Sequence, residues 1–469
     1  MRRWPAIVSV LALAGCMVGP DYQRPTTELP ATFPESAAAA HAPGAVPDAW
    51  WRLFDDPVLD DLVSTALAAN VDIAQAVARI EEADANLRAV NAALIPEIDL
   101  GAAGVRSASS TKVAAPSPPI VRNDVRVAFT TSYEIDFWGK LRRASEAARA
   151  TDFSTRYAKD VVTLSVAALT TQTYFLLRSL DAQISATRAT LLSRDDTLVI
   201  VRRRADGGLA SDLEVHQAEG ARSDAAFQLD ELLRERSLAE HLLATLTGRL
   251  DLAIPPGDLA HLPLPALPPP GLPSVLLERR PDIRQAEQDL VAANAEIGVA
   301  RAQMFPTISL TGAFGGESAS LAGLFTVPGR VWAVGTGLTQ PIFDAGRLSA
   351  LVDVQRARER QALAAYQRTI QTGFREVQDA LTNVQRFAAL ESDAQASVNA
   401  AREALRLANE RYGAGYTGFL DVLDSQRSLN VAELALIRSR QSLLSAGVDL
   451  MRALGGGWQP ETVEGPVPG

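Results

Sequence analysis

The chain repeats its own pattern about halfway along its length. A first landmark, Leu94-Ile95-Pro96, returns as Met304-Phe305-Pro306, 210 residues later. Two later landmarks return after 207 residues, and they pair Gly139-Lys140-Leu141 with Gly346-Arg347-Leu348 and Leu213-Glu214-Val215 with Leu420-Asp421-Val422. Three landmarks in the same order, with slippage only between the first and the second, indicate that one supersecondary unit was duplicated.

Each copy of this unit contains a very long stretch without proline. Proline is absent from 120–254 and from 342–459. Because an interior proline removes a backbone hydrogen bond and clashes with the preceding turn, such gaps permit very long helices. Apolar residues recur at helical spacing over 140–206 and 347–413. Each segment would be a helix of roughly 100 Å at 1.5 Å per residue. Helices of that length are expected in coiled-coil-like assemblies.

A glycine turn follows each long segment, at Gly207-Gly208 and at Gly413-Ala414-Gly415. A left-handed glycine can reverse the chain there. Second helices are therefore expected over 211–248 and 418–455. The first of these opens on Ser211-x-x-Glu214, which has the pattern of a capping box.

Between a shorter helix and the long helix of each copy, apolar residues alternate with polar or small ones. Strands are expected at about 97–106, 124–136, 307–315 and 331–343, and the shorter helices at 58–95 and 282–305. This alternation is typical of a transmembrane β-barrel and equally of any half-exposed hairpin. Known single-chain barrels begin at about eight strands, and an open sheet edge in lipid is costly. If these strands cross a membrane, several copies of the chain must combine.

Composition argues against several other classes of function. The net charge is −10 and no run of Lys or Arg could track phosphates, so nucleic acid is not an expected partner. Four His and one Cys leave little material for a metal site or a Cys/His pair. No nucleophile elbow or phosphate-binding glycine loop occurs. We therefore expect no enzyme activity, no cofactor and no metal.

The N-terminus has the pattern of a lipoprotein signal. Residues 1–15 join Arg2-Arg3 to a short apolar stretch that ends at Ala14-Gly15, directly before Cys16. This resembles the bacterial lipoprotein cleavage box, in which the cysteine is lipidated. Met17 rather than Asp follows, which by the same resemblance suggests the outer membrane. The alternative is a buried apolar cysteine near a signal peptide.

The landmarks and prolines divide the chain into six segments. They are the signal peptide 1–15, a lipid-anchored segment 16–57, a first repeat 58–248, a Pro-rich linker 249–280, a second repeat 281–455 and a tail 456–469. Each repeat is expected to contain a helix, a hairpin, a long helix and a second helix.

Several motifs resemble those of one family, the TolC/OprM-like outer-membrane efflux lipoproteins of the NodT-like branch. They are Cys16-x-Val18-Gly19-Pro20-Asp21-Tyr22, Trp50-Trp51-x-x-Phe54-x-Asp56-Pro57, Glu278-Arg279-Arg280-Pro281-Asp282, Phe343-Asp344-x-Gly346-Arg347 and Arg411-Tyr412-x-x-Gly415. The resemblance covers nearly the whole mature chain. It implies a mainly α protein with a membrane β-barrel, in which a homotrimer shares twelve strands, four from each chain. The barrel would continue into a long α-helical tunnel in the periplasm.

The same resemblance implies a function and partners. The protein would be the passive outer-membrane exit duct for small molecules in a tripartite efflux pump. It would work with a periplasmic adaptor, or membrane fusion protein, and with an inner-membrane transporter, commonly of the resistance–nodulation–division class. Two alternatives remain, a periplasmic coiled-coil lipoprotein without a pore and the exit duct of a type I protein secretion system. The sequence does not indicate the cargo.

By resemblance, Asp421 and Asp424 fall on an acidic ring at the periplasmic aperture. Their i, i+3 spacing puts both carboxylates on one helical face, and a ring of them in three copies should attract cations. Asp421 would also be favoured simply by the helix dipole. Tyr412 and Glu214 fall on positions that link the mobile helix pair to its neighbour, although Glu214 has a second explanation in its capping box.

The glycine turns fall where an adaptor docks in the family. The candidate docking residues are Gly207, Gly208, Leu209, Ala414, Gly415 and Tyr416. Glycines in such places also serve simply as helix C-caps.

Overall fold

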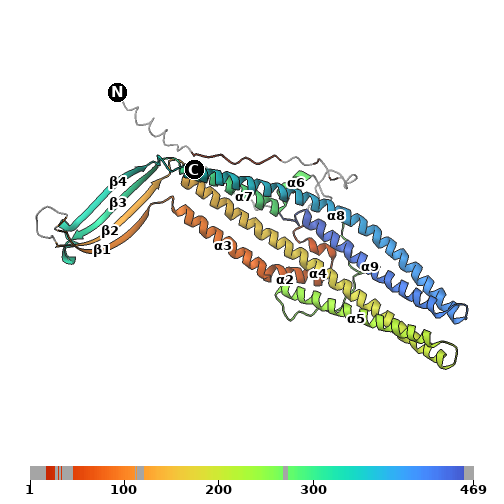
Figure 1. The fold of residues 1–469 in the computed structure, drawn as a ribbon. Helices are drawn as coiled ribbons and strands as arrows, with labels where there is room; N and C mark the ends of the chain where they lie inside the picture. Colours follow the sequence, from red (N-terminus) through yellow and green to blue (C-terminus); the bar gives the residue numbers. More distant parts are fainter. Residues whose placement is uncertain are drawn as a thin grey trace. The chain divides into compact units, whose positions relative to one another are not determined.

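The structure is a computed structural model that describes residues 17–26, 30, 33, 46–110, 112, 121–267 and 273–458 (Figure 1). The expected signal peptide, the lipidation site Cys16 and the tail beyond residue 458 lie outside the described residues. The chain forms two compact units. The strand unit comprises 1–26, 79–156 and 285–367, and the helix unit comprises 27–78, 157–284 and 368–469. Both sequence repeats contribute to both units, so the repeat boundary at the Pro-rich linker does not separate the compact units.

The strand unit contains one antiparallel sheet in the order β1-β2-β3-β4. Its strands are β1 (Glu97–Ala108), β2 (Val121–Ile135), β3 (Thr307–Ser318) and β4 (Arg330–Thr339). Each repeat supplies one hairpin, and the pairing of β2 with β3 joins the two repeats. Strands β1 and β4 are therefore the two edges (Figure 1).

The register of the sheet collects the apolar residues of all four strands on one face. One cross-strand row consists of Leu100, Phe129, Phe314 and Trp332. The adjacent row, on the opposite face, consists of Asp99, Thr130, Ala313 and Ala333. Successive residues of a strand point to opposite faces. The expected alternation thus gives the sheet one continuous apolar face. On this face Phe314 is 58% exposed and Trp332 is 76% exposed.

The strand ends differ from the expected ones. Strand β4 ends at Thr339 rather than at residue 343, because Pro341 lacks the N–H that a ladder needs. Strands β1 and β3 are longer than expected and end at Ala108 and Ser318. Two short 3₁₀ turns, η3 (Leu321–Gly323) and η4 (Val327–Gly329), follow β3.

Long helices leave the sheet in both repeats. They are α4 (Lys140–Asp206) and α8 (Arg347–Gly413), which have the bounds that the sequence predicts. One stretch of α4 is long and apolar enough to cross a membrane by composition, but half of it is buried within the protein, as is usual for a core helix. The helices that lead into the sheet are α3 (Val71–Ala92) and α7 (Pro281–Ala302).

The single helix expected at 58–95 is instead two helices, α2 (Pro57–Ala69) and α3. Asn70 lies between them with extended backbone, and its Oδ1 accepts a hydrogen bond from the N–H of Asp72 at 2.9 Å. Its Nδ2 donates to the carbonyl of Leu246 at 3.1 Å. Asparagine favours such side chain–backbone bonds over a continuous helix, which explains the break.

The helix unit is built on the return helices α5 (Asp212–Thr247) and α9 (Phe419–Ala453). Its core also takes in the short helices η2 (Trp50–Phe54) and α2. The largest fully buried core side chains include Trp50, Phe54, Tyr174, Phe175, Leu243 and Leu444. The last residues of the expected linker form a helix, α6 (Pro273–Arg279). A proline is tolerated at the first position of a helix. The linker predicted from the Pro-rich composition was therefore too long at its C-terminal end.

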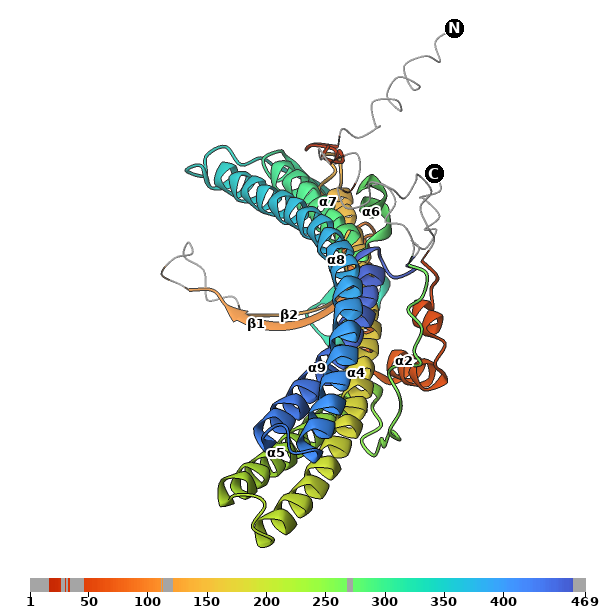
Figure 2. The same ribbon diagram turned by 90° about the vertical axis from the view of Figure 1, so that its right-hand side faces the viewer.

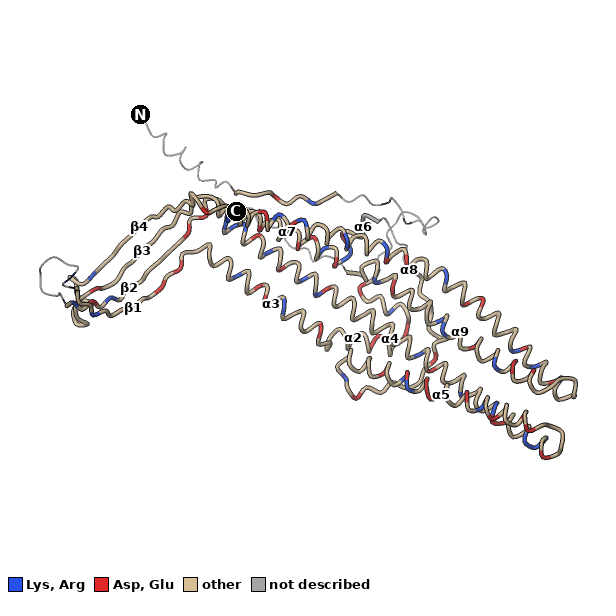
Figure 3. The backbone as a smooth tube through the Cα atoms, viewed as in Figure 1, with Lys and Arg blue, Asp and Glu red and all other residues tan. Residues whose placement is uncertain are grey.

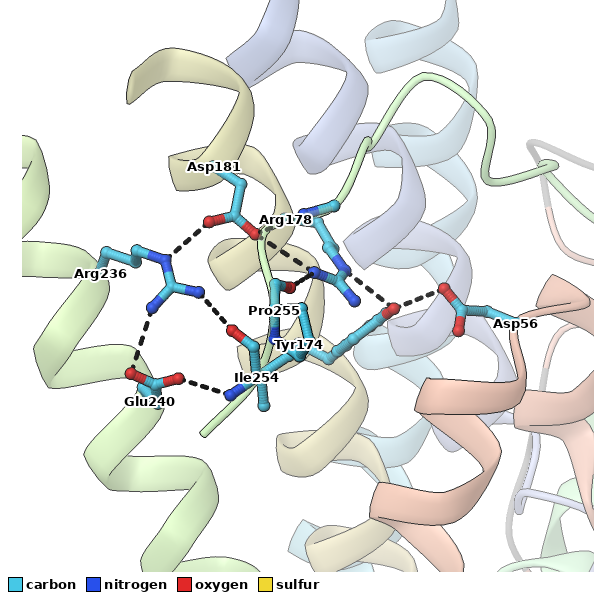
Figure 4. Close-up of polar contacts among 9 residues, drawn as sticks. Asp56, Tyr174, Arg178, Asp181, Arg236, Glu240, Ile254 and Pro255 are labelled. Atoms are coloured by element: carbon cyan, nitrogen blue, oxygen red, sulfur yellow. Dashed lines mark hydrogen bonds and ion pairs between the residues drawn. The ribbon is translucent and has the colours of Figure 1, made fainter. Parts of the chain in front are cut away.

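A buried polar network ties the segment after α5 to the core of the helix unit (Figure 4). Arg178 donates to the carbonyl of Pro255 at 2.7 Å, and Arg236 donates to the carbonyl of Ile254 at 2.6 Å. Both guanidinium groups also contact the buried carboxylate of Asp181. A buried ion pair is tolerated when its remaining donors and acceptors are satisfied, and here backbone groups of the linker satisfy them.

The same network extends to the N-terminal segment of the helix unit. The Tyr174 hydroxyl donates to Asp56 at 2.5 Å and accepts from Arg178 Nε at 2.9 Å (Figure 4). Burial raises the pKa of Tyr174 above its usual range, so the hydroxyl stays protonated. Gly257 lies so close to Arg178 that a Cβ atom there would lie 2.5 Å from the guanidinium. These contacts hold the linker residues Ile254, Pro255 and Gly257 against the core of the helix unit.

Residues 17–26 lie in the strand unit, close to the point where β2 passes into α4. The N–H of Val18 donates to the carbonyl of Trp138 at 3.1 Å. The buried side chain of Arg143 donates to Asp21 at 2.5 Å. These contacts fix the start of the described chain beside the end of the sheet.

Candidate functional site

The candidate site lies at the free ends of two helical hairpins in the helix unit. One hairpin is formed by α4 and α5 and the other by α8 and α9 (Figures 1 and 2). We call residues 207–211 the first tip and residues 414–418 the second tip. Both tips are built from the glycine turns that the sequence indicates.

The two tips use the same capping motif. In the first tip, the N–H of Leu209 donates to the carbonyl of Arg204 at 2.7 Å. In the second tip, Tyr416 donates to Arg411 in the same way at 2.9 Å. Gly208 (φ 70°) and Gly415 (φ 79°) occupy the left-handed position of this Schellman motif. A Cβ at either glycine would meet open space, so backbone conformation alone favours glycine there.

The residue after each of these glycines projects from its tip. Leu209 is 74% exposed and Tyr416 is 81% exposed, and the two positions correspond in the duplication. The other candidate docking residues, Gly207 and Ala414, are also exposed. The tips therefore present one large side chain each on an otherwise small surface.

Tyr412 connects the two hairpins. It belongs to a small hydrophobic cluster with Phe419 and Val201, and its ring centroid lies 5.7 Å from that of Phe419. The guanidinium of Arg204, on α4, lies over the Tyr412 ring at 4.5 Å from its centroid. Burial raises the pKa of the Tyr412 hydroxyl, the charge of Arg204 opposes this, and the charge of Glu214 adds to it.

Glu214 and Tyr412 are close without being hydrogen-bonded. The Tyr412 hydroxyl oxygen is buried and has no hydrogen-bond partner among the described residues. Glu214 lies in the first turn of α5, where its backbone N–H donates to Ser211 Oγ at 3.4 Å. The contact that joins the hairpins at this level is the cation–π contact of Arg204 with Tyr412.

Asp421 and Asp424 lie near the start of α9 and are both exposed, whereas Phe419 and Val422 on the same turns are buried. Asp421 is in the first turn, where the helix dipole favours an anion. The structure places Asp424, but not Asp421, beside a hollow of about 540 Å³.

Charged residues of both signs line this hollow. Arg194, Asp224 and Arg427 lie there with Asp424. Arg194 is buried, and its guanidinium donates to the carbonyl of Ala221. Burial lowers the pKa of Arg194, and Arg427 lowers it further while Asp224 opposes both. Two basic residues and one further acidic residue of the same chain thus line the hollow with Asp424.

Ion pairs hold each hairpin together internally. Helices α4 and α5 are joined by Arg202–Glu219 and Arg222–Asp195, both at 2.7 Å, and α8 and α9 by Arg402–Glu433 at 3.1 Å and Arg440–Glu391 at 3.2 Å. Figure 3 shows these helices carrying Lys/Arg and Asp/Glu side by side. Both helices of a hairpin are therefore expected to move together.

Polar contacts between the hairpins are neutral near the tips, whereas farther along the helices Arg438 donates to Gln183 at 3.1 Å and Gln172 donates to Asp449 at 2.8 Å. Gln426 donates to Thr197 Oγ1 at 3.4 Å, and Asn430 donates to Gln228 Oε1 at 3.1 Å. Over the described parts of these helices, no ion pair joins one hairpin to the other. The Gln426 side-chain oxygen is buried and has no hydrogen-bond partner in the described part of the chain.

The sequence did not reveal the contact residues Arg204, Thr197 and Gln426. The one available signal was that Arg204 corresponds to Arg411 in the duplication, in the last turn before a tip. Among the described residues, no group of three or more His, Cys, Asp or Glu could hold a metal ion.

Comparisons with known proteins give one consistent result. A profile of the family described as outer membrane efflux protein matches residues 62–249 and 272–456. The chain is 36% identical to the outer membrane protein OprJ of Pseudomonas aeruginosa over 460 residues, which is 97% of this chain and 95% of that protein. It is 35% identical to the toluene efflux pump outer membrane protein TtgF of Pseudomonas putida over 463 residues, which covers 97% and 96% of the two chains. The CmeC outer membrane channel of Campylobacter jejuni has a similar structure, with a TM-score of 0.87 at 28% identity over 95% of this chain and 96% of that chain.

Proposed function

The chain belongs to the outer membrane efflux protein family, and we propose that three copies form the exit duct of a tripartite efflux pump. The sheets of the three chains would close into one barrel of twelve strands in the outer membrane. The helices would form a tunnel in the periplasm. The duct would be passive and carry out no reaction of its own.

The observation that supports this proposal most is the sheet. Among the described residues it has four strands, one apolar face and two edge strands that pair on one side only. In lipid, every backbone N–H and C=O needs a partner, so open edges are excluded there. Pairing of β1 of one copy with β4 of the next would satisfy both edges. A pore-free scaffold would have no use for an apolar face on these hairpins.

Conductance tests this proposal directly. Purified protein in a planar bilayer is expected to give discrete channel events, rare while the tips are closed. Deletion of the gene is expected to increase sensitivity to small toxic molecules. Purified, folded protein that gives no conductance would favour the scaffold and count against the duct.

We assign Asp421 and Asp424 to an acidic ring at the periplasmic aperture. Two exposed carboxylates from each of three copies would surround the axis. Like charges at close range attract cations to such a ring. The double variant D421A/D424A should lower cation selectivity and weaken block by multivalent cations. Asp393→Ala, an exposed position on α8 far from the second tip, is the control. Unchanged cation selectivity in the double variant would contradict the assignment of Asp421 and Asp424 to the ring.

We also propose that Tyr412 and Glu214 act at the gate. Their proximity, the unpaired Tyr412 hydroxyl and the contact with Arg204 support a role in holding the hairpins together. A hydrogen bond between them would form or break as the hairpins move. Tyr412→Phe keeps the ring stacking and removes the hydroxyl. If the hydroxyl links the two hairpins, the channel of this variant should open more often than the wild-type channel. An unchanged opening rate would mean that Arg204, and not the hydroxyl, links the hairpins.

Docking of a periplasmic adaptor is proposed at the two tips. Gly207, Gly208 and Leu209 in the first tip and Ala414, Gly415 and Tyr416 in the second are the residues concerned. The exposed glycines and Ala414 let the tip of a partner helix approach closely, and the projecting side chains of Leu209 and Tyr416 would contact it. The inner-membrane transporter would supply the energy for transport through that adaptor.

Lipidation of Cys16 is proposed as the second anchor of the protein. Val18, two residues after Cys16 in the sequence, is held beside the end of the sheet by its bond to Trp138, which supports an anchor on this side of the proposed barrel. Cys16→Ser should abolish labelling with radioactive palmitate, and the barrel should still insert. As cargo we propose small organic molecules, because the relative TtgF is named for toluene efflux.

A further inference from the structure

The strand unit contains a hollow of about 780 Å³ beside the end of the sheet. It lies where the N-terminal segment at Val18 and Gly19 meets the end of α7 and the first turns of α8. Arg301 and Arg356 line it on the helix side, and Met304 and Phe305 line it next to β3. The lining of the hollow thus contains two basic side chains, the acidic Asp353 and several apolar side chains.

The charges in the hollow are not balanced. Arg356 forms an ion pair with Asp353 at 3.1 Å. Arg301 lies in the last turn of α7 and has no hydrogen bond or ion pair from its side chain among the described residues. Its neighbourhood therefore keeps one uncompensated positive charge, in a chain whose net charge is −10.

The duplication shows what this place looks like when it is filled. Arg301 corresponds to Asn91 and Val352 to Ser145. In the first repeat Ser145 Oγ donates directly to Asn91 Oδ1 at 2.6 Å. In the second repeat the same two positions carry a long cation and an apolar residue, and a hollow replaces the bond. The second repeat thus has a hollow where the first repeat has a direct contact.

The position of the hollow suggests its ligand. Arg301 is only a few residues before the first residue of β3, Thr307, and Arg356 is in the third turn of α8. The head-group layer of a bilayer is about 5–8 Å deep on each side of the hydrocarbon core. Side chains on a helix tilt toward its N-terminus, so Arg356 reaches back toward the sheet. If the sheet lies in the outer membrane, both guanidinium groups would lie near the periplasmic head-group layer.

We propose that this hollow binds the phosphate of a phospholipid head group, with Arg301 as the principal contact. A guanidinium matches a phosphate with two parallel hydrogen bonds. Met304 and Phe305, both substantially exposed, would contact the start of the acyl chains. This inference rests on the proposed function, because it requires the sheet to lie in the membrane.

The test is native mass spectrometry of the full, lipidated oligomer in detergent, titrated with dioleoyl phosphatidylglycerol. Arg301→Gln is expected to raise the apparent Kd at least about tenfold, which corresponds to about 1.4 kcal/mol. The matched control is Arg149→Gln, because Arg149 corresponds to Arg356 and is exposed and unpaired among the described residues. This control should bind like wild type.

A second variant covers the case in which Arg301→Gln fails to fold. The double variant R301N/V352S copies the Asn91–Ser145 pair into the second repeat and should fold while losing the bound lipid. Equal lipid binding in wild type, R301Q and R149Q would overturn the proposal. So would a wild-type oligomer that binds no lipid, which would mean that a neighbouring copy fills the hollow.

Competition separates the two sources of phosphate. Inorganic phosphate at millimolar concentration should leave the bound lipid in place. Displacement by equimolar inorganic phosphate would assign the hollow to a free anion and contradict the lipid. Conductance of the same samples distinguishes failure of this proposal from failure of the proposed function. If the wild type conducts but its lipid binding does not depend on Arg301, only the lipid site is contradicted.

Discussion

The sheet and the helix tips differ in the kind of contact that holds their parts together. In the sheet, eleven or twelve consecutive residue pairs join β1 to β2 and β2 to β3, and each pair puts its side chains on a defined face. At the tips, two internally ion-paired hairpins meet through a small hydrophobic cluster, one cation–π contact and neutral amide or hydroxyl contacts.

The sheet is therefore expected to be rigid, and the helix tips are expected to be able to move. A one-residue slip in the sheet would turn every apolar side chain to the wrong face, so the register is strongly specified. A neutral hydrogen bond contributes only about 0.5–1.5 kcal/mol. Separation of the two tips therefore costs little in polar contacts, whereas contacts with the charged groups of Arg438 and Asp449 join the hairpins farther along the helices.

The largest expected effect is on the apolar face of the sheet. Phe129→Arg puts a charge near the middle of β2 on that face, at a cost of about 2–4 kcal/mol if the face contacts lipid. Thr130→Arg is the matched control, because Thr130 is the next residue and points to the opposite face. Heat stability of the oligomer on gels is expected to fall for F129R and to stay close to wild type for T130R. Equal losses in both variants would mean that the two faces are not distinguished by lipid.

A smaller effect of opposite sign is expected between the hairpins. Gln426 is buried and its side-chain oxygen has no partner. Gln426→Leu removes that orphan acceptor, whose burial costs about 1–3 kcal/mol, and keeps a similar volume. The closed tips should become more stable, so the channel should open less often in planar bilayers. Gln395→Leu on the exposed face of α8 is the control. More frequent opening of Q426L would show that the neutral contacts hold the tips more firmly than we infer.

The third effect concerns the tip backbone. Gly208→Ala forces a residue with a Cβ into a left-handed conformation and should destabilise the first tip by about 1 kcal/mol. Gly220→Ala lies within α5, where a Cβ also meets open space, and should stabilise that helix by about 0.5–1 kcal/mol. Urea unfolding of the two variants should shift in opposite directions. Shifts of the same sign would argue against the Schellman cap.

The smallest expected effect concerns the cation–π contact. Arg204→Ala removes about 0.5–1 kcal/mol of attraction to Tyr412. Spontaneous opening should become two- to five-fold more frequent. Arg203→Ala, at the exposed neighbouring position, should leave the opening rate unchanged. A larger effect of R203A than of R204A would remove Arg204 from the gate.

Sequence patterns predicted the elements well where one physical rule dominates. Proline-free spacing placed α4 and α8, and strict alternation placed the four strands, because backbone geometry and period decide these features. The break at Asn70 and the helix α6 at Pro273 were missed. In those places a single side chain–backbone bond, or a proline at the first position of a helix, overrides the pattern.

Only part of the candidate site could be predicted from the sequence. The tip glycines follow from turn chemistry. The contact of Arg204 with Tyr412, the bond of Thr197 with Gln426 and the hollow at Arg301 depend on which residues of different helices come together. Such contacts join segments more than 200 residues apart in two cases, and periodicity within one helix contains no information about them.

The central claim is that one chain supplies only part of a membrane wall. The mass of the purified complex, measured by native mass spectrometry after release from detergent, tests it most directly. We expect the mass of three mature chains with their lipid, each chain being 50.0 kDa less the mass of the signal peptide 1–15. A stable single chain, with both sheet edges protected from hydrogen exchange, would contradict it.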